Sequence, residues 1–332
     1  MPGQHTEVTA AGIARLAGVG RAAVSNWRRR YAHFPRPVGG TETSPTFSLP
    51  EIEEWLRDQG KLAEVPLRER LWQLVGSDPA GPADALGRVG DQLLAHGEGV
   101  PEEAGEDPLA RAAAALAGEA GPAPAYEFLM ARYLDTAGRQ LTLTPPETAE
   151  LMAALAGPAD TVLDPACGPC TLLAAARSRD GGPPRELYGQ DTDASLARLG
   201  SLRLALRGTA TVRAHDGDTL LADAFPQLAA DAVLCHPPFN ERNWGHDQLT
   251  YDPRWEYGIP ARTESELAWV QHALARLRPG GTAVLLMPPA AASRRTGRRV
   301  RATLLRRGAL RAVIALPAGA APPHSLPLHL WI

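Results

Sequence analysis

The turn that follows residues 231–235 has the residue types to hold a planar ring. It reads His236-Pro237-Pro238-Phe239 and comes after a short apolar run that predicts a buried strand. The two prolines fix the backbone and carry no N–H group, so the Pro237 carbonyl is rigid and free to accept a hydrogen bond. The Phe239 ring offers a face for stacking. The turn is therefore a candidate binding element, with a stacking face beside a fixed acceptor.

Acidic residues follow two successive predicted strands. The strand at 161–163 leads into Asp164 and a loop containing Gly168, and the strand at 186–189 is followed by Asp191. In parallel sheets, ligands bind beyond the carboxyl ends of strands, where a loop brings backbone N–H groups close to them. An acid after the second strand can accept hydrogen bonds from ribose hydroxyls. The spacing of 27 residues between the two acids favours an adenosine-containing ligand; two solvated loop acids are the alternative.

Arginine-rich segments lie near both ends of the chain. The predicted helix at 21–30 carries side chains that can reach base edges or phosphates, namely Arg21, Ser25, Asn26, Arg28 and Arg29. Residues 294–307 contain seven arginines and no acid. Arginine matches phosphate geometry well, so we assign to DNA binding Arg294, Arg295, Arg298 and Arg299. For both segments the alternative is a solvated helix surface.

The apolar pattern supplies the elements that must position these side chains. Two short helices within 8–30, a ribbon within 34–49 and a helix at 51–59 are typical of a winged helix-turn-helix. Residues 63–75 and 109–140 predict helices, whereas 76–108, rich in Gly, Pro and acidic residues, predicts a linker. From 141 onward, strands alternate with helices, which indicates a mostly parallel α/β sheet covered on both faces. The strands are predicted at 161–163, 186–189, 211–213, 232–235, 282–287 and 310–315, and the helices at 171–178, 194–207, 264–277 and 300–307.

The composition is that of a globular protein with unevenly distributed charge. The 332 residues include 34 basic and 37 acidic side chains, for a net charge of −3. Residues 1–62 hold 8 basic and 6 acidic groups, residues 63–280 hold 18 and 31, and residues 281–332 hold 8 and none. The near-neutral total therefore does not exclude a polyanionic partner, because both ends are basic. No membrane span or signal sequence is apparent, so we expect a cytoplasmic protein.

The three cysteines, Cys167, Cys170 and Cys235, are too few for a disulfide framework. They fall in the two candidate loops, with His236 beside Cys235, so a tetrahedral zinc site is one interpretation. Core packing is the other, and we expect no bound metal.

Residues 141–332 resemble the N6-adenine DNA methyltransferases of the type I restriction-modification modification-subunit family. The resemblance rests on seven motifs in order: Leu143-Thr144-Pro145-Pro146-Glu147, Asp164-Pro165-Ala166-Cys167-Gly168, Gly189-Gln190-Asp191, Gly217-Asp218-Thr219-Leu220, Pro237-Pro238-Phe239, Leu277-Arg278-Pro279-Gly280-Gly281 and Val313-Ile314-Ala315-Leu316-Pro317. Residues 8–60 separately resemble the winged helix-turn-helix of MerR or excisionase type. We therefore divide the chain into a DNA-binding domain at 1–62, an acidic helical and linker region at 63–140, and a Rossmann-like methyltransferase domain at 141–332. Because a last strand begins near Ser325 and the chain then stops, we expect that domain to be truncated.

The resemblance implies S-adenosylmethionine as the cofactor. Its loop would comprise Asp164, Pro165, Ala166, Cys167 and Gly168. Asp191 would hold the ribose, Asp218 would face the adenine amino group of the cofactor, and Thr144 and Pro145 would line its methionine end. Double-stranded DNA is the implied substrate, within a restriction-modification or defence system, and a specificity or restriction subunit is a further implied partner.

The resemblance also implies a base flipped out of the duplex and stacked on Phe239. In the family, an Asn before Pro-Pro-Phe and the first proline carbonyl accept hydrogen bonds from the target amino group. Here the Asn position is His236, which accepts one hydrogen bond when neutral and none when protonated. A second departure is Gly168-Pro169-Cys170, where the family continues as Gly-Ser/Thr-Gly; Cys170 would add a Cβ where the cofactor approaches or where φ is positive.

Three functional hypotheses remain open from the sequence. The first is adenine-N6 methylation of DNA. The second is a catalytically degenerate, methyltransferase-like DNA-binding or regulatory protein, suggested by the two departures. The third is methylation of another amino acceptor, such as cytosine N4, RNA or a small molecule, because the Pro-Pro-Phe turn fits amino groups generally.

Overall fold

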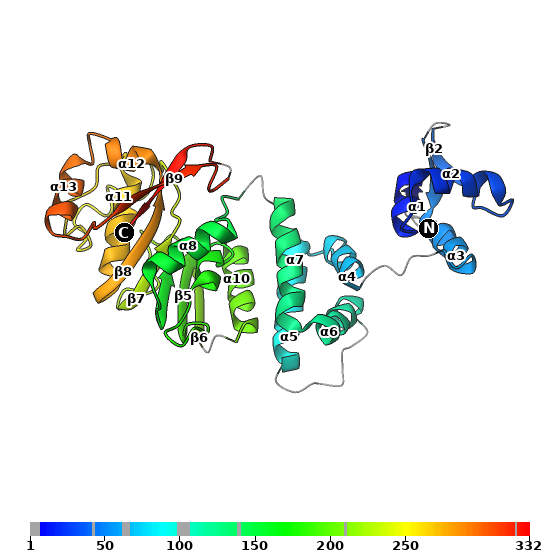
Figure 1. Cartoon of the computed structure of the whole chain (residues 1–332), viewed down its shortest axis with the longest axis horizontal. Coiled ribbons are helices and arrows are strands. Elements are labelled where there is room, and N and C mark those ends of the chain that lie inside the picture. Colours follow the sequence, from blue (N-terminus) through cyan, green and yellow to red (C-terminus); the bar gives the residue numbers. More distant parts are fainter. Residues whose placement is uncertain are drawn as a thin grey trace. The chain divides into compact units, whose positions relative to one another are not determined.

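The computed structural model describes seven stretches of the chain, which fall into two compact units. The described residues are 7–41, 44–61, 67–97, 107–137, 141–208, 211–322 and 324–332. Unit 1 is Met1–Arg70 and unit 2 is Leu71–Ile332 (Figure 1). From Leu71 onward, the predicted region 63–140 falls within unit 2.

Unit 1 is a small α/β unit built around one aromatic core. Its elements are β1 (Glu7–Thr9), α1 (Ala10–Leu16), α2 (Arg21–Arg30), β2 (Pro37–Thr41), β3 (Ser44–Ser48) and α3 (Leu49–Asp58). The antiparallel sheet has the order β1-β3-β2. Phe47, Ile13, Ile52 and Trp55 are buried together between the sheet and the helices. The helices and the ribbon follow the predicted order, whereas β1 was not predicted.

Four helices begin unit 2, and one of them contradicts the prediction of a linker over 76–108. They are α4 (Leu67–Gly76), α5 (Pro82–Gly97), α6 (Pro108–Ala120) and α7 (Pro122–Ala137). The linker prediction is wrong across α5, because its glycines serve packing. A Cβ on Gly90 would lie 2.8 Å from Leu202 Cδ1 and 3.0 Å from Tyr126 Cε2. Glycine therefore lets α5 approach its neighbours closely, and Leu86 is fully buried one turn earlier.

A seven-stranded sheet forms the centre of unit 2, with the order β6-β5-β4-β7-β8-β10-β9 (Figure 1). The strands are β4 (Thr161–Asp164), β5 (Glu186–Asp191), β6 (Thr211–Asp216), β7 (Ala230–Cys235), β8 (Leu277–Met287), β9 (Val313–Ala318) and β10 (Pro327–Trp331). The first five in spatial order are parallel, and β10 is antiparallel to both of its neighbours. The predicted, mostly parallel α/β sheet is confirmed, and the expected last strand pairs on both sides.

Helices cover both faces of this sheet, as the alternation along β8 shows. Val284 and Leu286 belong to one buried cluster, with residues of α8 (Pro146–Ala156), α9 (Thr171–Ala175) and α10 (Ala194–Leu206). Leu285 and Met287 belong to the other, with residues of α11 (Ser265–Ala275), α12 (Pro289–Ser293) and α13 (Arg298–Arg306). Successive residues of a strand point to opposite faces, so both faces are buried. None of the described helices is long and apolar enough to cross a membrane.

Candidate functional site

A cavity of about 690 Å³ lies at the carboxyl ends of the parallel strands of unit 2. It is where the strand order reverses, because β4 has β5 on one side and β7 on the other. Such a switch point is the usual ligand site of an open α/β sheet. Its walls include the loops after four strands, with Pro165, Ala166, Gly168, Asp191, Asp218, His236, Pro237, Pro238 and Phe239 among the lining residues.

Asp191 is the acid of this cavity that the backbone holds most firmly. Its Oδ2 accepts a hydrogen bond from the Gly168 N–H at 2.7 Å, and its Oδ1 accepts one from the Asp193 N–H at 2.9 Å. Gly168 has a φ of 46°, which favours glycine. A carboxylate has about four acceptor sites, so Asp191 retains capacity for hydroxyl donors in the cavity.

Asp164 and Cys167 lie behind the loop after β4. Asp164 is 1 % exposed, its Oδ1 accepts a hydrogen bond from the Ala166 N–H at 3.1 Å, and burial raises its pKa well above the usual value. Cys167 packs against Gly189, where an added Cβ would lie 2.9 Å from Cys167 Sγ. Neither side chain lines the cavity. Both shape the loop, whereas Pro165, Ala166 and Gly168 face the ligand space.

Cys170 occupies the left-handed conformation that its place in the loop requires. Its φ is 58°, which costs roughly 1–2 kcal/mol for a residue other than glycine. The side chain is fully buried in a hydrophobic cluster and does not line the cavity. Gly200 on α10 makes room for it, since a Cβ there would lie 2.5 Å from Cys170 Sγ. Of the two alternatives that the sequence left for Cys170, the positive φ is the one that the structure shows, and the side chain does not face the cavity.

Asp218 sits in a loop that is braced at three points. Its Oδ1 accepts hydrogen bonds from the N–H groups of Leu220 and Leu221, at 3.0 and 3.2 Å. Thr219 Oγ1 donates to the Pro165 carbonyl at 2.6 Å, which joins this loop to the loop after β4. The Arg254 guanidinium donates to the Leu220 carbonyl. The acid is thus presented to the cavity by a rigid loop.

His236 faces the cavity as a neutral imidazole. Its ring is 8 % exposed, and burial, with the nearby His324, lowers its pKa to about 4. Its Nδ1 lies 2.9 Å from Thr144 Oγ1, so one nitrogen is engaged. Its Nε2 is buried and has no hydrogen-bond partner among the described residues. Pro145 begins α8 as its N-cap beside Thr144.

The residue after the turn is held by a buried ion pair. Asn240 has a φ of 61°, and its N–H donates to Glu266 Oε1 at 3.0 Å. Glu266 is fully buried, and its Oε2 accepts from Arg294 Nη1 at 2.8 Å. Arg294 also donates to the Asn240 side chain. Arg294, which the sequence assigned to DNA, is therefore engaged inside the protein.

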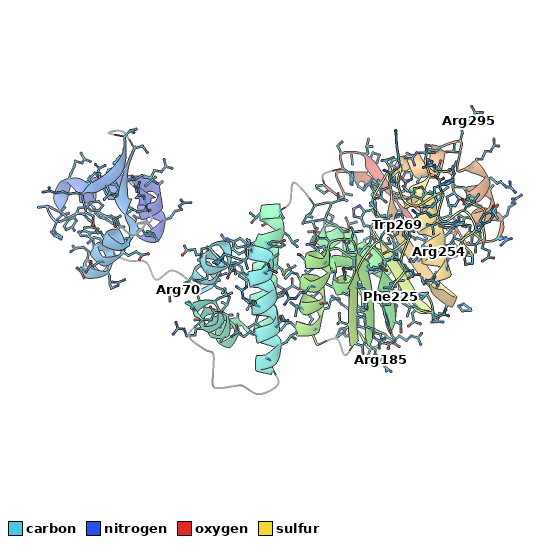
Figure 2. All side chains as sticks on the ribbon, turned by 180° about the vertical axis from the view of Figure 1, so that it is seen from behind. Arg70, Arg185, Phe225, Arg254, Trp269 and Arg295 are labelled. Atoms are coloured by element: carbon cyan, nitrogen blue, oxygen red, sulfur yellow. The ribbon has the colours of Figure 1, made fainter. Side chains whose placement is uncertain are left out.

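The other three arginines that the sequence assigned to DNA in the segment 294–307 are exposed, namely Arg295, Arg298 and Arg299. Figure 2 shows Arg295 pointing outward at the upper right of the view and Arg185 at the lower edge, below the sheet. On α2 of unit 1 the predicted contact residues Arg21, Ser25, Asn26, Arg28 and Arg29 are also exposed. The Arg29 guanidinium donates to Asn26 Oδ1 at 3.1 Å, and that of Arg28 lies 5.4 Å from the Phe47 ring centre.

All three thiols are buried and none forms a disulfide. Burial raises the pKa of Cys235 well above its usual value, and a hydrogen bond with Cys170, together with burial, does the same for Cys167. Across the described part of the chain, no group of three or more His, Cys, Asp or Glu side chains is placed to hold a metal ion.

The sequence missed several residues of the cavity. His324, from the segment between β9 and β10, is 5.0 Å from Phe239 and 6.1 Å from His236 between ring centres. Trp269 and the segment 141–143 also line the cavity. His324 follows β9 by six residues and belongs to none of the motifs, so only the three-dimensional fold identifies it.

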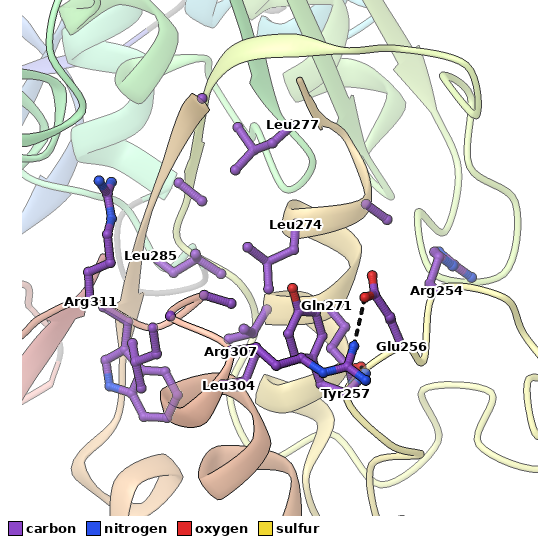
Figure 3. A pocket seen from close by; sticks show the side chains of 18 of the residues that line it. Arg254, Glu256, Tyr257, Gln271, Leu274, Leu277, Leu285, Leu304, Arg307 and Arg311 are labelled. Carbon is purple, nitrogen blue, oxygen red and sulfur yellow. Dashed lines mark hydrogen bonds and ion pairs between the residues drawn. The ribbon is translucent and has the colours of Figure 1, made fainter. Parts of the chain in front are cut away.

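A second cavity, of about 650 Å³, lies between α11, α13 and β8, with Leu274, Leu285 and Leu304 among its walls (Figure 3). Arg307 and Glu256 form an ion pair beside it, at 2.7 Å. It contains none of the residues that the sequence assigned to the cofactor or to catalysis.

Comparisons with known proteins agree on the nature of unit 2. The sequence model of the family described as N-6 DNA Methylase matches residues 123–332. Among curated proteins, the methylase subunit of the type I restriction enzyme HindI from Haemophilus influenzae is 25 % identical over 221 residues, which are 62 % of this chain and 49 % of that protein. The methylase subunit of the type I restriction enzyme MjaIX from Methanocaldococcus jannaschii is 27 % identical over 62 % of this chain and 39 % of that protein. The chain thus spans half or less of the length of these relatives.

Solved structures share the fold. A methyltransferase subunit of a type I restriction-modification system from Streptococcus thermophilus has a TM-score of 0.59 at 20 % identity, over 96 % of this chain and 75 % of that one. A putative class I S-adenosylmethionine-dependent methyltransferase from Listeria monocytogenes has a TM-score of 0.60 at 17 % identity. The match covers 80 % of this chain and 86 % of that one.

Proposed function

Because the chain belongs to the N-6 DNA methylase family, we propose that it transfers a methyl group from S-adenosylmethionine to the exocyclic amino group of adenine in DNA. The observation that carries this proposal is the cavity itself. It brings Asp191 and Asp218 together with the turn from His236 to Phe239, although the two groups come from strands on either side of β4. The wall with Asp191 and Asp218 has hydrogen-bond acceptors for a nucleoside. The wall with the turn has an acceptor, the Pro237 carbonyl, beside the ring of Phe239.

The residues present fit the proposed cofactor. The Asp191 carboxylate has spare acceptor capacity for ribose hydroxyls, and Gly168 leaves the loop open at the point where a side chain would project. Asp218 offers a second carboxylate to an amino donor, as the resemblance implies. The bound sulfonium would supply an activated methyl group.

In the proposed reaction His236 and Pro237 hold the target amino group. A neutral imidazole accepts a hydrogen bond through Nε2 when its proton is on Nδ1. The Nδ1–H group of His236 can then donate a hydrogen bond to Thr144 Oγ1. The Pro237 carbonyl accepts the second amino hydrogen, and Phe239 stacks on the base. These two acceptors would draw the lone pair of the amino nitrogen out of the ring and make that nitrogen the nucleophile for the methyl group that the bound sulfonium would supply. The amino proton would then leave to solvent.

A base inside a duplex cannot enter this cavity, so the target must leave the stack. We propose that Arg295, Arg298 and Arg299 bind the phosphates beside it, and that α2 of unit 1 contributes contacts through Arg21, Ser25, Asn26, Arg28 and Arg29. The curated relatives are methylase subunits of type I restriction enzymes, so a specificity or restriction subunit is the partner that we propose.

The direct test is methyl transfer from labelled S-adenosylmethionine to double-stranded DNA, paired with a calorimetric titration of the cofactor. We expect incorporation at adenine N6 and stoichiometric cofactor binding. If the protein neither binds the cofactor nor transfers the methyl group, the proposal is wrong. Parallel reactions with RNA and with DNA lacking adenine measure the alternative acceptors, and preference for either would reassign the substrate.

The phosphate contacts have their own test. Replacing Arg295→Gln should weaken DNA binding about equally for all sequences and reduce the salt slope by about 1. Arg185 is an exposed arginine at a different edge of the unit, so Arg185→Gln is the matched control and should leave the slope unchanged. Equal effects of the two substitutions would contradict the assigned surface.

A catalytically degenerate protein is the second candidate, favoured by His236 in place of Asn. The His236→Asn variant decides between them. If it transfers methyl groups and the native protein does not, the native chain is degenerate; activity of the native protein excludes that interpretation.

A further inference from the structure

Three aromatic rings from two distant parts of the chain meet at one side of the cavity. The ring centres of His236 and Phe239 are 5.3 Å apart, those of Phe239 and His324 are 5.0 Å apart, and those of the two histidines are 6.1 Å apart. His324 and Leu326 come from the segment between β9 and β10, and both line the cavity together with Leu328 of β10. The two imidazoles therefore lie next to each other and both contact the Phe239 ring.

Both imidazoles have a buried nitrogen without a partner. The Nε2 atoms of His236 and His324 are inaccessible to solvent and form no hydrogen bond with the described residues. Leaving such a group without a hydrogen bond destabilises the folded protein. Both histidines line the same cavity, so a ligand bound there is the available partner for the two orphaned nitrogens.

The chemistry of the ligand assigns the two nitrogens different roles. An amino group has two hydrogens, and in the proposed reaction these go to His236 Nε2 and the Pro237 carbonyl. In adenine the ring nitrogen beside the amino group is an acceptor, so only a donor can pair with it. An imidazole with its proton on Nε2 is a donor, and His324 is the remaining member of the ring cluster with a free buried nitrogen.

We propose that His324 is a specificity-determining residue that donates a hydrogen bond from Nε2 to the ring nitrogen next to the target amino group. His236 and His324 together then read an edge with one donor and one acceptor, which adenine has and which guanine and thymine lack, because their ring nitrogens carry hydrogen. This inference rests on the proposed function. It adds a residue that does not take part in the chemical step.

Base analogues test the inference without requiring methyl transfer. Three short single-stranded DNA oligonucleotides differ only at one position, which holds adenine, purine without the amino group, or 1-deazaadenine without the ring acceptor. Their affinities for the full chain are measured by fluorescence anisotropy. We expect both analogues to bind about five-fold more weakly than adenine, which is the effect of one hydrogen bond of ~1 kcal/mol.

Variants separate His324 from its neighbours. His324→Ala should abolish the difference between adenine and 1-deazaadenine, keep the difference between adenine and purine, and leave the affinity for S-adenosylmethionine unchanged. His324→Gln, which retains an N–H donor, should restore part of the discrimination. The exposed His215, which does not line the cavity, provides His215→Ala as the matched control.

The inference is wrong if the native protein binds adenine and 1-deazaadenine equally or if His324→Ala preserves their difference. Failure of the proposed function would instead appear as a native protein that discriminates the bases but transfers no methyl group.

Discussion

The loop after β4 and the turn after β7 both depart from the pattern of the family, and the structure treats the two departures differently. In the first, Cys170 replaces glycine, and its side chain turns into the core against Gly200. In the second, His236 replaces asparagine, and its free Nε2 lies at the edge of the cavity. Gly200 makes room for the larger side chain of Cys170. No described residue provides a hydrogen-bond partner for His236 Nε2.

The difference shows how to read a changed motif residue. A side chain that points into the core changes stability, and a small neighbour can accommodate it. A side chain that points into a cavity changes what the cavity binds. Cys170 therefore bears on folding, whereas His236 bears on chemistry, although the two positions looked equally disruptive in the sequence.

Activity should separate the two positions most strongly. The substitution His236→Ala removes an acceptor for the reacting amino group and should lower kcat/KM for methyl transfer about 100- to 1000-fold, as loss of one preorganised polar contact does. Cys170→Gly restores the family residue outside the cavity and should change kcat/KM less than about 3-fold. Steady-state assays with labelled S-adenosylmethionine measure both. A large loss for Cys170→Gly together with a small one for His236→Ala would reverse the comparison.

Sequence reasoning succeeded where a pattern was local and failed where distant segments meet. The strands and the acids after them were predictable because apolar runs and loop residues follow one another in the chain. The helix α5 was missed because Gly87 and Gly90, which resemble helix breakers in the sequence, are the positions of closest contact with α10 and α7. The engagement of Arg294 by Glu266 and the approach of His324 to Phe239 depend on tertiary structure.

The turn after β7 should also depend on its buried ion pair. Glu266→Gln breaks the ion pair with Arg294 and should lower the free energy of unfolding by about 3–4 kcal/mol, in the range for breaking a buried pair. Urea unfolding at pH 7 measures the loss. Glu256→Gln breaks an ion pair with Arg307 in which both side chains are more than half exposed, so as a control it should cost less than about 1 kcal/mol. Similar losses for the two variants would show that burial does not govern these ion pairs.

A third contrast is the dependence of stability on pH. Burial lowers the pKa of His236 to about 4 in the folded protein, below the value of about 6.5 in an unfolded chain. As pH falls from 6.5 to 4, the unfolded state binds the proton and the folded state does not, so stability decreases, by about 3 kcal/mol for this group. The His236→Asn variant should lack this part of the decrease when unfolding is followed across that range. His272, whose pKa burial lowers to about 3, contributes equally to both proteins and cancels in the comparison.

The smallest expected effect tests the compensation at Cys170. Gly200→Ala places a Cβ 2.5 Å from Cys170 Sγ and 3.0 Å from Cys170 Cβ. Overpacking of this kind costs about 1–3 kcal/mol, and the gain in helix propensity of about 1 kcal/mol offsets part of it. We expect a net loss of about 1–2 kcal/mol in the native background. In the Cys170→Gly background both contacts with residue 170 are gone and the contact with the Pro169 backbone carbon at 3.0 Å remains. The same substitution should therefore cost less there, and the two sites should be coupled. Equal losses in the two backgrounds would mean that Gly200 does not accommodate Cys170, and the contrast between the two loops would then rest on His236 alone.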